Sequence, residues 1–265
     1  MYKNFLIVAS KIDKAGINIT TQLSQYGNMN FYLVENEVLF TENLDTGKFD
    51  NYDFIIFASR HASENPEAKK TLSVHAPGNF GKAEFGGKEK KVCKTSALFQ
   101  KQLFEKLKEI SEKFSLEKYD LTMECTHHGP LINKPCIFVE IGPTEEEWKD
   151  RRAGFVVAKA IYETINSFKE NPYNEVAIGI GGSHYCPAFN KLQMDSNIAI
   201  SHVIPQYVFP LTEEMVREAI AGTDENVDIL LMDWKGLGNV EEREKVLAVV
   251  NKFYIQKRKT SEIGK

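Results

Sequence analysis

The order of apolar and amphipathic segments is the feature that most limits the fold of this chain. Short runs rich in Val, Ile and Phe, typical of strands buried on both faces, occur at 4–10, 52–63, 136–142, 175–182 and 197–205. Helical patterns lie between them, as at 97–114, where apolar residues recur on one face. Thr144 and Glu147 form a capping box that predicts the start of another long helix. The alternation predicts an α/β fold, with a mainly parallel or mixed sheet flanked by helices.

The sequence shows no sign of a domain boundary. No internal repeat, low-complexity segment or linker interrupts residues 1–265, so we expect a single domain. The glycine-rich stretch 77–87 is expected to form an exposed loop, and the polar stretch 256–265 a frayed tail. No apolar run approaches the roughly 20 residues of a membrane span, and no leader is recognisable. We therefore expect a cytoplasmic protein without membrane contact.

Charge and cysteine content exclude some classes of protein. With 33 basic and 37 acidic residues the net charge is −4, so any contact with RNA needs a local basic patch. The four cysteines have no C-x-x-C spacing, which argues against a disulfide framework or a structural zinc knuckle. Cys125 and Cys186 lie near histidines, but buried thiols are favoured over a covalent mechanism.

All six histidines map to the ends of predicted strands, and none lies in a predicted helix. They are His61, His75, His127, His128, His184 and His202. In parallel α/β sheets the ligand site lies beyond the carboxyl ends of the strands, so residues distant in sequence can meet there. A single histidine in such a place is as often a hydrogen-bonded surface or core residue. Their common placement favours one shared site.

The chemistry of this group indicates a metal. Glu140 is a carboxylate inside the apolar run "CIFVEIG", where burial without a partner is unfavourable. Histidine and carboxylate together are ligands that suit Zn²⁺, and a catalytic zinc keeps one position for water. We expect one or two zinc ions per chain.

Two further motifs have weaker implications. "GIGGSH" at 179–184 is similar to a phosphate-binding loop, but no helical pattern follows at once, so a turn that carries His184 is favoured and no nucleotide cofactor is expected. The run "KEKKVCK" at 88–94 adjoins the glycine-rich stretch. Its lysines are candidates for phosphate contact, although a charge run is often only a solvated face.

Six motifs together resemble one known family. In chain order they are "SRHAS", "SVHAPGNFG", "ECTHHGP", "EIGPTEEEW", "GIGGSHYCP" and "SHVIPQY", and they extend over most of the chain. They are similar to the archaeal-type D-aminoacyl-tRNA deacylases, a family also found in plants. The resemblance implies a zinc-dependent hydrolase that acts in proofreading by freeing tRNA from D-amino acids. It also implies a core similar to the phosphorylase/hydrolase-like fold.

The resemblance implies the substrate, whereas the roles of individual residues are inferred from their placement and chemistry. The expected metal ligands are His75, His127, Glu140, His184 and His202. The expected catalytic residues are His128 and Glu124. The expected contacts to substrate and tRNA are His61, Gly78, Phe80, Gly81, Lys88, Lys90 and Lys91, with the glycines bringing main chain close to the aminoacyl end.

Alternatives remain open at this point. The protein is expected to be a monomer whose partner is D-aminoacyl-tRNA. A zinc-dependent peptidase or amidohydrolase on a similar fold is one alternative. A non-catalytic RNA-binding module with structural histidines is the other. The range of accepted D-amino acids and the group that rejects L-aminoacyl-tRNA are not indicated.

Overall fold

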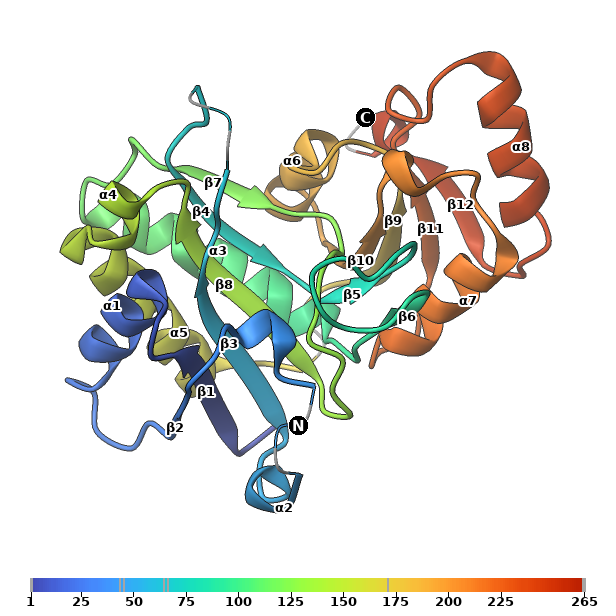
Figure 1. Cartoon of the computed structure of the whole chain (residues 1–265). Coiled ribbons are helices and arrows are strands. Elements are labelled where there is room, and N and C mark those ends of the chain that lie inside the picture. The colour runs from blue at the N-terminus through green and yellow to red at the C-terminus, as the bar shows by residue number, and fades with distance from the viewer. Residues whose placement is uncertain are drawn as a thin grey trace.

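The first half of the chain builds a six-stranded mixed sheet (Figure 1). The computed structural model describes residues 2–42, 44, 46–63, 65, 67–170 and 172–263. The sheet order is β2-β1-β3-β8-β4-β7. The strands are β1 (Phe5–Ser10), β2 (Phe31–Val34), β3 (Phe54–Arg60), β4 (Thr71–His75), β7 (Asp120–Met123) and β8 (Cys136–Gly142). Neighbouring strands are parallel except β4 and β8, which are antiparallel. The predicted α/β class with a mixed sheet flanked by helices is confirmed.

One face of this sheet is covered by helices and the other by shorter segments. The helices are α1 (Lys14–Leu23), α3 (Ala97–Lys113) and α5 (Arg151–Ser167), and each begins at a side-chain cap: Asp13, Ser96 and Asp150. Their apolar residues share one core with every second residue of the strands. The opposite face packs against η1 (Val38–Phe40), α2 (Thr46–Phe49) and the chain near residue 131. Among the described residues, no long helix covers this second face.

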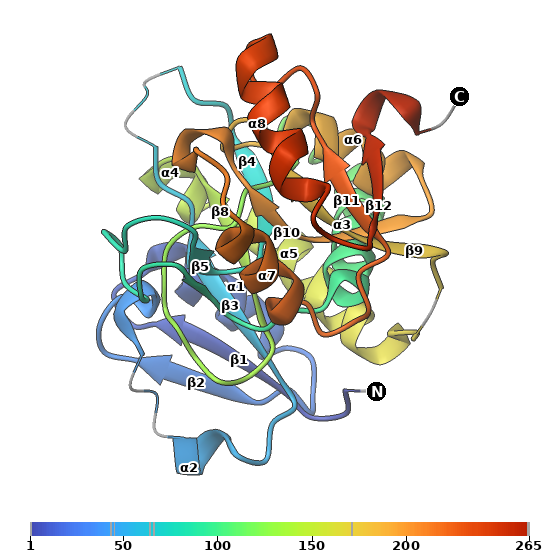
Figure 2. The ribbon, with the colours of Figure 1, turned by 90° about the vertical axis from the view of Figure 1, so that its right-hand side faces the viewer.

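A second, four-stranded sheet follows, in which all neighbouring strands are parallel. Its order is β10 (Ile198–Ile204), β9 (Glu175–Ile180), β11 (Ile229–Met232) and β12 (Gln256–Lys259). Figure 2 shows α7 (Glu213–Gly222) and α8 (Val240–Val250) on its outer side. On its inner side it shares the main core with α3 and with α6 (Pro187–Asp195). The helix α3 therefore packs against both sheets.

Several predicted elements have different boundaries in the structure. The long helix expected from Thr144 is interrupted: α4 (Glu145–Trp148) ends, and the carboxylate of Asp150 accepts the amides of Arg152 and Ala153 to start α5. The tail expected from 256 pairs instead as β12, and η3 (Thr260–Glu262) follows it. Residues 264 and 265 of that tail lie outside the described residues. The sequence pattern also missed α6, which begins with Pro187 at its first position.

The glycine-rich stretch 77–87 is only partly an exposed loop. β5 (Gly78–Asn79) pairs with β6 (Lys91–Val92), and residues 77–80 are buried.

In the part of the chain that the structure describes, no helix has the length and apolar character needed to cross a membrane.

Candidate functional site

The candidate site lies on the face of the six-stranded sheet that carries no long helix among the described residues. Side chains alternate between the two faces of a strand. Glu140 of β8 lies beside Ser59 of β3 and Ser73 of β4, so these polar residues share this face, whereas Val139 and Ile141 join the helix-covered core. β4 runs antiparallel to β8. The end of β4, at His75, therefore lies opposite Phe138 of β8. It does not lie at the carboxyl edge expected from the sequence.

The two sheets meet at this site through the segment that follows β7. The amide of Cys125 donates to the carbonyl of His184 at 2.9 Å, and the amide of Thr126 donates to the carbonyl of Val203 at 3.0 Å. The chain thus leaves the first sheet after Glu124 and pairs with the second. This crossing brings His184, which follows β9, against residues of the first sheet.

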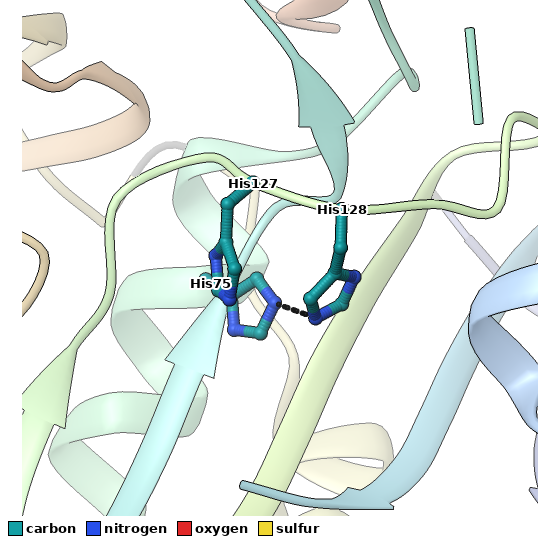
Figure 3. Close-up of side chains that lie close together, drawn as sticks. All are labelled: His75, His127 and His128. Carbon is teal, nitrogen blue, oxygen red and sulfur yellow. Dashed lines mark hydrogen bonds between the residues drawn. The ribbon is translucent and has the colours of Figure 1, made fainter. Parts of the chain in front are cut away.

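Three histidine rings converge at the end of β4 (Figure 3). The Nε2 atoms of His75 and His128 are 3.2 Å apart, and the rings of His75 and His127 have centroids 4.4 Å apart. The Nδ1 atom of His127 donates to the carbonyl of Cys125, and that of His128 to the carbonyl of Gly129, at 2.8 and 2.7 Å. These bonds fix the tautomer, so the Nε2 atoms of both rings carry free lone pairs.

Glu124 is the centre of a second group of side chains. It is 1% exposed. Its two carboxylate oxygens lie 3.1 Å from Nδ1 of His61 and 3.0 Å from Nε2 of His184. The Nε2 atom of His127 lies 3.4 Å from the second oxygen, so Glu124 connects the two groups.

The two groups differ in their protonation. Burial, followed by repulsion among the rings, holds the pKa of His75 and of His127 well below its usual range. Burial also lowers the pKa of His128 to about 4. Burial opposes charge on His184 too, but its contacts with Cys125 and Glu124 outweigh this and raise its pKa to about 10. The first group is therefore neutral at pH 7, while His184 is an imidazolium.

The two buried carboxyl groups also differ. Burial would raise the pKa of Glu124, but the hydrogen bonds from His184 and His61 outweigh it and hold that pKa well below its usual range. Burial and then repulsion by Glu124 and Asp13 raise the pKa of Glu140 well above it. The ionised form is thus favoured for Glu124 and the protonated form for Glu140.

A cavity of about 320 Å³ opens beside these residues. Its lining includes Asp13, Glu37, Val38, Leu39, Ser59, Arg60, His61, Ala62, Phe85, His127, His128, Glu140 and His184. The apolar part of the wall comes from η1 and from Phe85 of the glycine-rich stretch. The charged part includes the ion pair of Arg60 with Glu37. The cavity thus offers both apolar and charged surface next to the histidines.

The described residues contain four overlapping groups that could hold a metal ion. They are His75–His127–His128, Cys125–His127–His184, His61–Glu124–His184 and His75–Glu124–Glu140. In each group the ligand atoms lie within 4.8 Å of one another. All but one of the histidines, and both predicted carboxylates, belong to at least one of these groups.

His202 is the histidine that the structure does not bring to the cluster. It lies within β10 rather than at its end, because this strand continues to Ile204. Its ring is buried, with Nδ1 3.0 Å from the hydroxyl of Thr126 and Nε2 3.1 Å from the carbonyl of Cys93. Both ring nitrogens are thus engaged in the protein interior, which argues against the predicted metal contact.

Of the glycine and phenylalanine residues predicted to contact substrate, some lie in the protein interior and others at the surface. Phe80 is 2% exposed and belongs to the core of the second sheet, which argues against contact with substrate. Gly78 donates its amide to the carbonyl of His128 at 2.8 Å, and a Cβ there would lie 2.4 Å from the backbone of Val92, so only glycine fits. Gly81 is partly exposed, and a Cβ there would come no nearer than 3.7 Å to its closest neighbour, Val208.

The predicted lysines lie on the surface next to α7. Lys88, Lys90 and Lys91 are exposed. Lys91 is 2.8 Å from the carboxylate of Glu218, and Lys90 is 3.8 Å from that of Glu214. These acids offset part of the positive charge that the sequence suggested.

Sequence reasoning missed several residues of the cavity and its surroundings. Phe85 lines the cavity, although the sequence indicates only a flexible loop there. The hydroxyl of Tyr185 lies 2.9 Å from Nε2 of His61. The sequence identifies Asp13 only as a helix cap; its carboxylate also accepts the amide of Arg60 at 2.9 Å, which ties the start of α1 to the end of β3. Neighbours of the histidines in the motifs "SRHAS" and "GSHYCP" were the available signal.

Comparisons with known proteins agree on one family. A family model described as D-aminoacyl-tRNA deacylase matches residues 48–257. A protein of Thermococcus onnurineus named D-aminoacyl-tRNA deacylase is 34% identical, over 92% of this chain and 96% of its own length. One of the same name from Methanocaldococcus jannaschii is 33% identical, over 90% and 93%. The crystal structure of a conserved protein of unknown function superposes with a TM-score of 0.88 and 30% identity, covering 98% of this chain and 96% of that one.

Proposed function

This chain belongs to the D-aminoacyl-tRNA deacylase family, and from that premise we propose that its histidine cluster holds a zinc ion for the hydrolysis of D-aminoacyl-tRNA. The enzyme cleaves the ester bond between the D-amino acid and the tRNA and releases both. The observation that supports the proposal best is the approach of the two Nε2 atoms of His75 and His128 to 3.2 Å.

That distance fits two ligands of one metal ion. Two imidazole nitrogens at about 2.0–2.1 Å from a tetrahedral Zn²⁺ are about 3.3–3.4 Å apart. The Nδ1 atom of His75 is buried without a hydrogen-bond partner in the described structure, and its Nε2 faces another ring nitrogen. The lowered pKa of His75, His127 and His128 favours their neutral form, which is the form that binds a metal. We therefore propose these three as the zinc ligands.

This assignment changes four roles proposed from the sequence. His128 moves from catalysis to the metal, and His184 moves from the metal to catalysis. Glu140, which lines the cavity, and His202, whose ring nitrogens are engaged away from the cluster, were expected as metal ligands and are assigned to neither role. A second zinc at His61, Glu124 and His184 is the other arrangement that the geometry allows, and it would displace the proton from His184.

The residues of the chain would act as an acid–base pair. Zinc, when bound, polarises the ester carbonyl and makes water nucleophilic near neutral pH. Glu124, held ionised by His61 and His184, accepts the proton that water loses as its oxygen attacks the carbonyl carbon. His184 carries a proton and lines the cavity, so it donates that proton to the ribose oxygen as the ester C–O bond breaks. The D-aminoacyl group would occupy the adjoining cavity.

Deacylation of D- and L-tyrosyl-tRNA with and without a chelator tests this proposal. We expect hydrolysis of the D-ester, slow hydrolysis of the L-ester, loss of activity with chelator, and recovery when Zn²⁺ is added back. Activity that persists after the metal is shown to be absent would reject the zinc mechanism.

The expectations that the enzyme is a monomer and acts in the cytoplasm remain predictions.

A further inference from the structure

The carboxyl edge of the second sheet carries a row of aromatic side chains. β10 is followed by Tyr207, β9 by Tyr185 and β11 by Trp234, while β12 ends at Lys259. Because the four strands are parallel, all these residues lie along one edge. Tyr207 is 57% exposed and Tyr185 37% exposed, and Trp234 is partly exposed. From Tyr207 after β10 to Lys259 at the end of β12, the edge spans three strand spacings, about 14 Å.

One end of this row touches the candidate active site. The hydroxyl of Tyr185 is 2.9 Å from Nε2 of His61, and that of Tyr207 is 3.1 Å from Sγ of Cys125. The loop that carries His184 continues to the loop of Trp234 through a hydrogen bond from the amide of Gly182 to the carbonyl of Gly236, at 3.3 Å. The loops that carry His184 and Trp234 are therefore neighbours at this edge.

The other end of the row combines aromatic and positive groups. The ammonium of Lys259 lies 4.1 Å from the ring centre of Trp234, and the guanidinium of Arg243, from α8, lies 5.3 Å from it. In the described part of the chain no ion pair within 4 Å joins Arg243 to an acid. One carboxylate oxygen of Glu262 lies 3.9 Å from the ammonium of Lys259. The other oxygen accepts the backbone amide of Lys259 at 3.0 Å. These two cations therefore remain available to a ligand.

We propose that this edge binds the single-stranded 3′ end of the tRNA. Aromatic side chains stack on unpaired bases, and nearby cations contact the phosphates, a combination typical of single-strand binding surfaces. Tyr185 and Tyr207 take the nucleotides next to the ester, and Trp234 takes a base further upstream, with Arg243 and Lys259 on its phosphates. The inference rests on the proposed function, because it takes tRNA as the substrate.

The alternative role for the far end is structural. Trp234 also packs against the core of the second sheet. In this alternative its two cation contacts tie α8 to β12 and do not touch the substrate. A structural contact and a substrate contact differ in their effect on substrates of different length. D-Tyrosyl-adenosine has the ester and the terminal nucleoside but no upstream nucleotides, so it reaches the tyrosines and not Trp234.

Steady-state kinetics on D-tyrosyl-tRNA and D-tyrosyl-adenosine separate these roles. For W234A we expect KM for the tRNA ester to rise about tenfold with kcat little changed, given the stacking contribution of one base. For R243Q/K259Q the salt dependence should flatten by about 1.4 in slope, since each phosphate neutralised on a single strand contributes about 0.7. Neither variant should change KM for D-tyrosyl-adenosine. The milder W234F keeps the packing and should show a smaller rise.

The matched control changes the opposite, amino edge of the same sheet. Tyr254 is fully exposed there, and Lys252 is paired with Glu213. The variant K252Q/Y254S also removes one aromatic and one cation, and it should leave both substrates unaffected. Wild-type KM and salt slope in W234A and R243Q/K259Q, or an equal rise in KM for both substrates, would overturn the inference. A wild-type enzyme that does not cleave D-tyrosyl-tRNA would instead reject the proposed function.

Discussion

Glu124 and Glu140 lie in the same buried cluster but carry different charge because their neighbours differ. Two histidine nitrogens lie within 3.1 Å of the oxygens of Glu124 and compensate its charge. Glu140 has His61 only at 3.9 Å, and the anionic Glu124 repels its ionised form. With two carboxyl groups this close together, ionisation is favoured at Glu124 and protonation at Glu140. In the proposed reaction the ionised carboxylate, Glu124, is the one able to accept a proton.

Replacing each glutamate by glutamine should therefore give unequal effects. In E124Q the proton acceptor is lost while the three proposed zinc ligands remain, so we expect kcat to fall by about 10²–10⁴ with zinc content unchanged. In E140Q a neutral amide replaces a neutral acid of similar shape, so kcat should change by less than about threefold. Both variants need zinc analysis and kinetics on D-tyrosyl-tRNA. Loss of zinc in E140Q would return Glu140 to the ligand role predicted from the sequence.

The histidines offer a second test at this scale. H127A removes a proposed ligand, and we expect it to lose both stoichiometric zinc and activity while remaining folded. H202A is the contrasting variant, because the sequence predicts His202 as a ligand but its ring bonds to Thr126 and Cys93. It should keep its zinc, and its free energy of unfolding should fall by about 1–3 kcal/mol because buried polar partners lose their hydrogen bond. A folded H202A without zinc would contradict the present ligand assignment.

Residue types and strand ends were enough to predict most members of the cluster. They were not enough to predict which members bind the metal and which transfer protons. The pattern of histidines after strands identified His61, His75, His127, His128 and His184 as neighbours. It placed His202 with them because two residues of error in the end of a strand decide whether a side chain faces the site or the core. Charge states could not be predicted, since they depend on ångström-scale distances between side chains far apart in sequence.

At the scale of elements, the direction of β4 decides where the site lies. A parallel sheet would have placed the histidines at its carboxyl edge, but β4 and β7 run against β8, so their ends lie level with the middle of β8. The sequence carried no signal for this reversal, because buried strands of either direction have the same apolar pattern. The hairpin β5–β6 was missed for another reason: two-residue strands are too short for any periodicity.

The prediction that the lysines of this hairpin contact tRNA still applies. Replacing Lys88, Lys90 and Lys91 together by alanine should raise KM for D-tyrosyl-tRNA and flatten its salt dependence, by about one unit of slope for each phosphate that a lysine no longer neutralises. The structure adds a reciprocal variant. E214Q/E218Q removes the acids that face Lys90 and Lys91, so it should lower KM and steepen the salt dependence. Unchanged salt slopes in both variants would assign these lysines to a solvated surface.

At the scale of the whole molecule, the two sheets share one core although they are not hydrogen-bonded into one sheet. The main hydrophobic cluster includes Ile7 and Ile137 of the first sheet and Ile200 and Leu231 of the second. The helix α3 packs between them. Separate sheets were not predicted, since the alternation of strands and helices is the same in one sheet or two. The single domain expected from the absence of a linker stays a prediction, and the shared core supports it.

A shared core predicts that both halves unfold together. The chain has only two tryptophans, Trp148 at the end of α4 beside the first sheet and Trp234 after β11 of the second. W234F leaves a fluorescent probe of the first half, and W148F leaves a probe of the second. In each variant, urea unfolding followed by fluorescence should give the same midpoint as unfolding followed by far-UV circular dichroism, because no part of the common core is stable alone. A fluorescence midpoint that departs from the circular dichroism midpoint in either variant would show that the sheets unfold independently and that the chain is two domains.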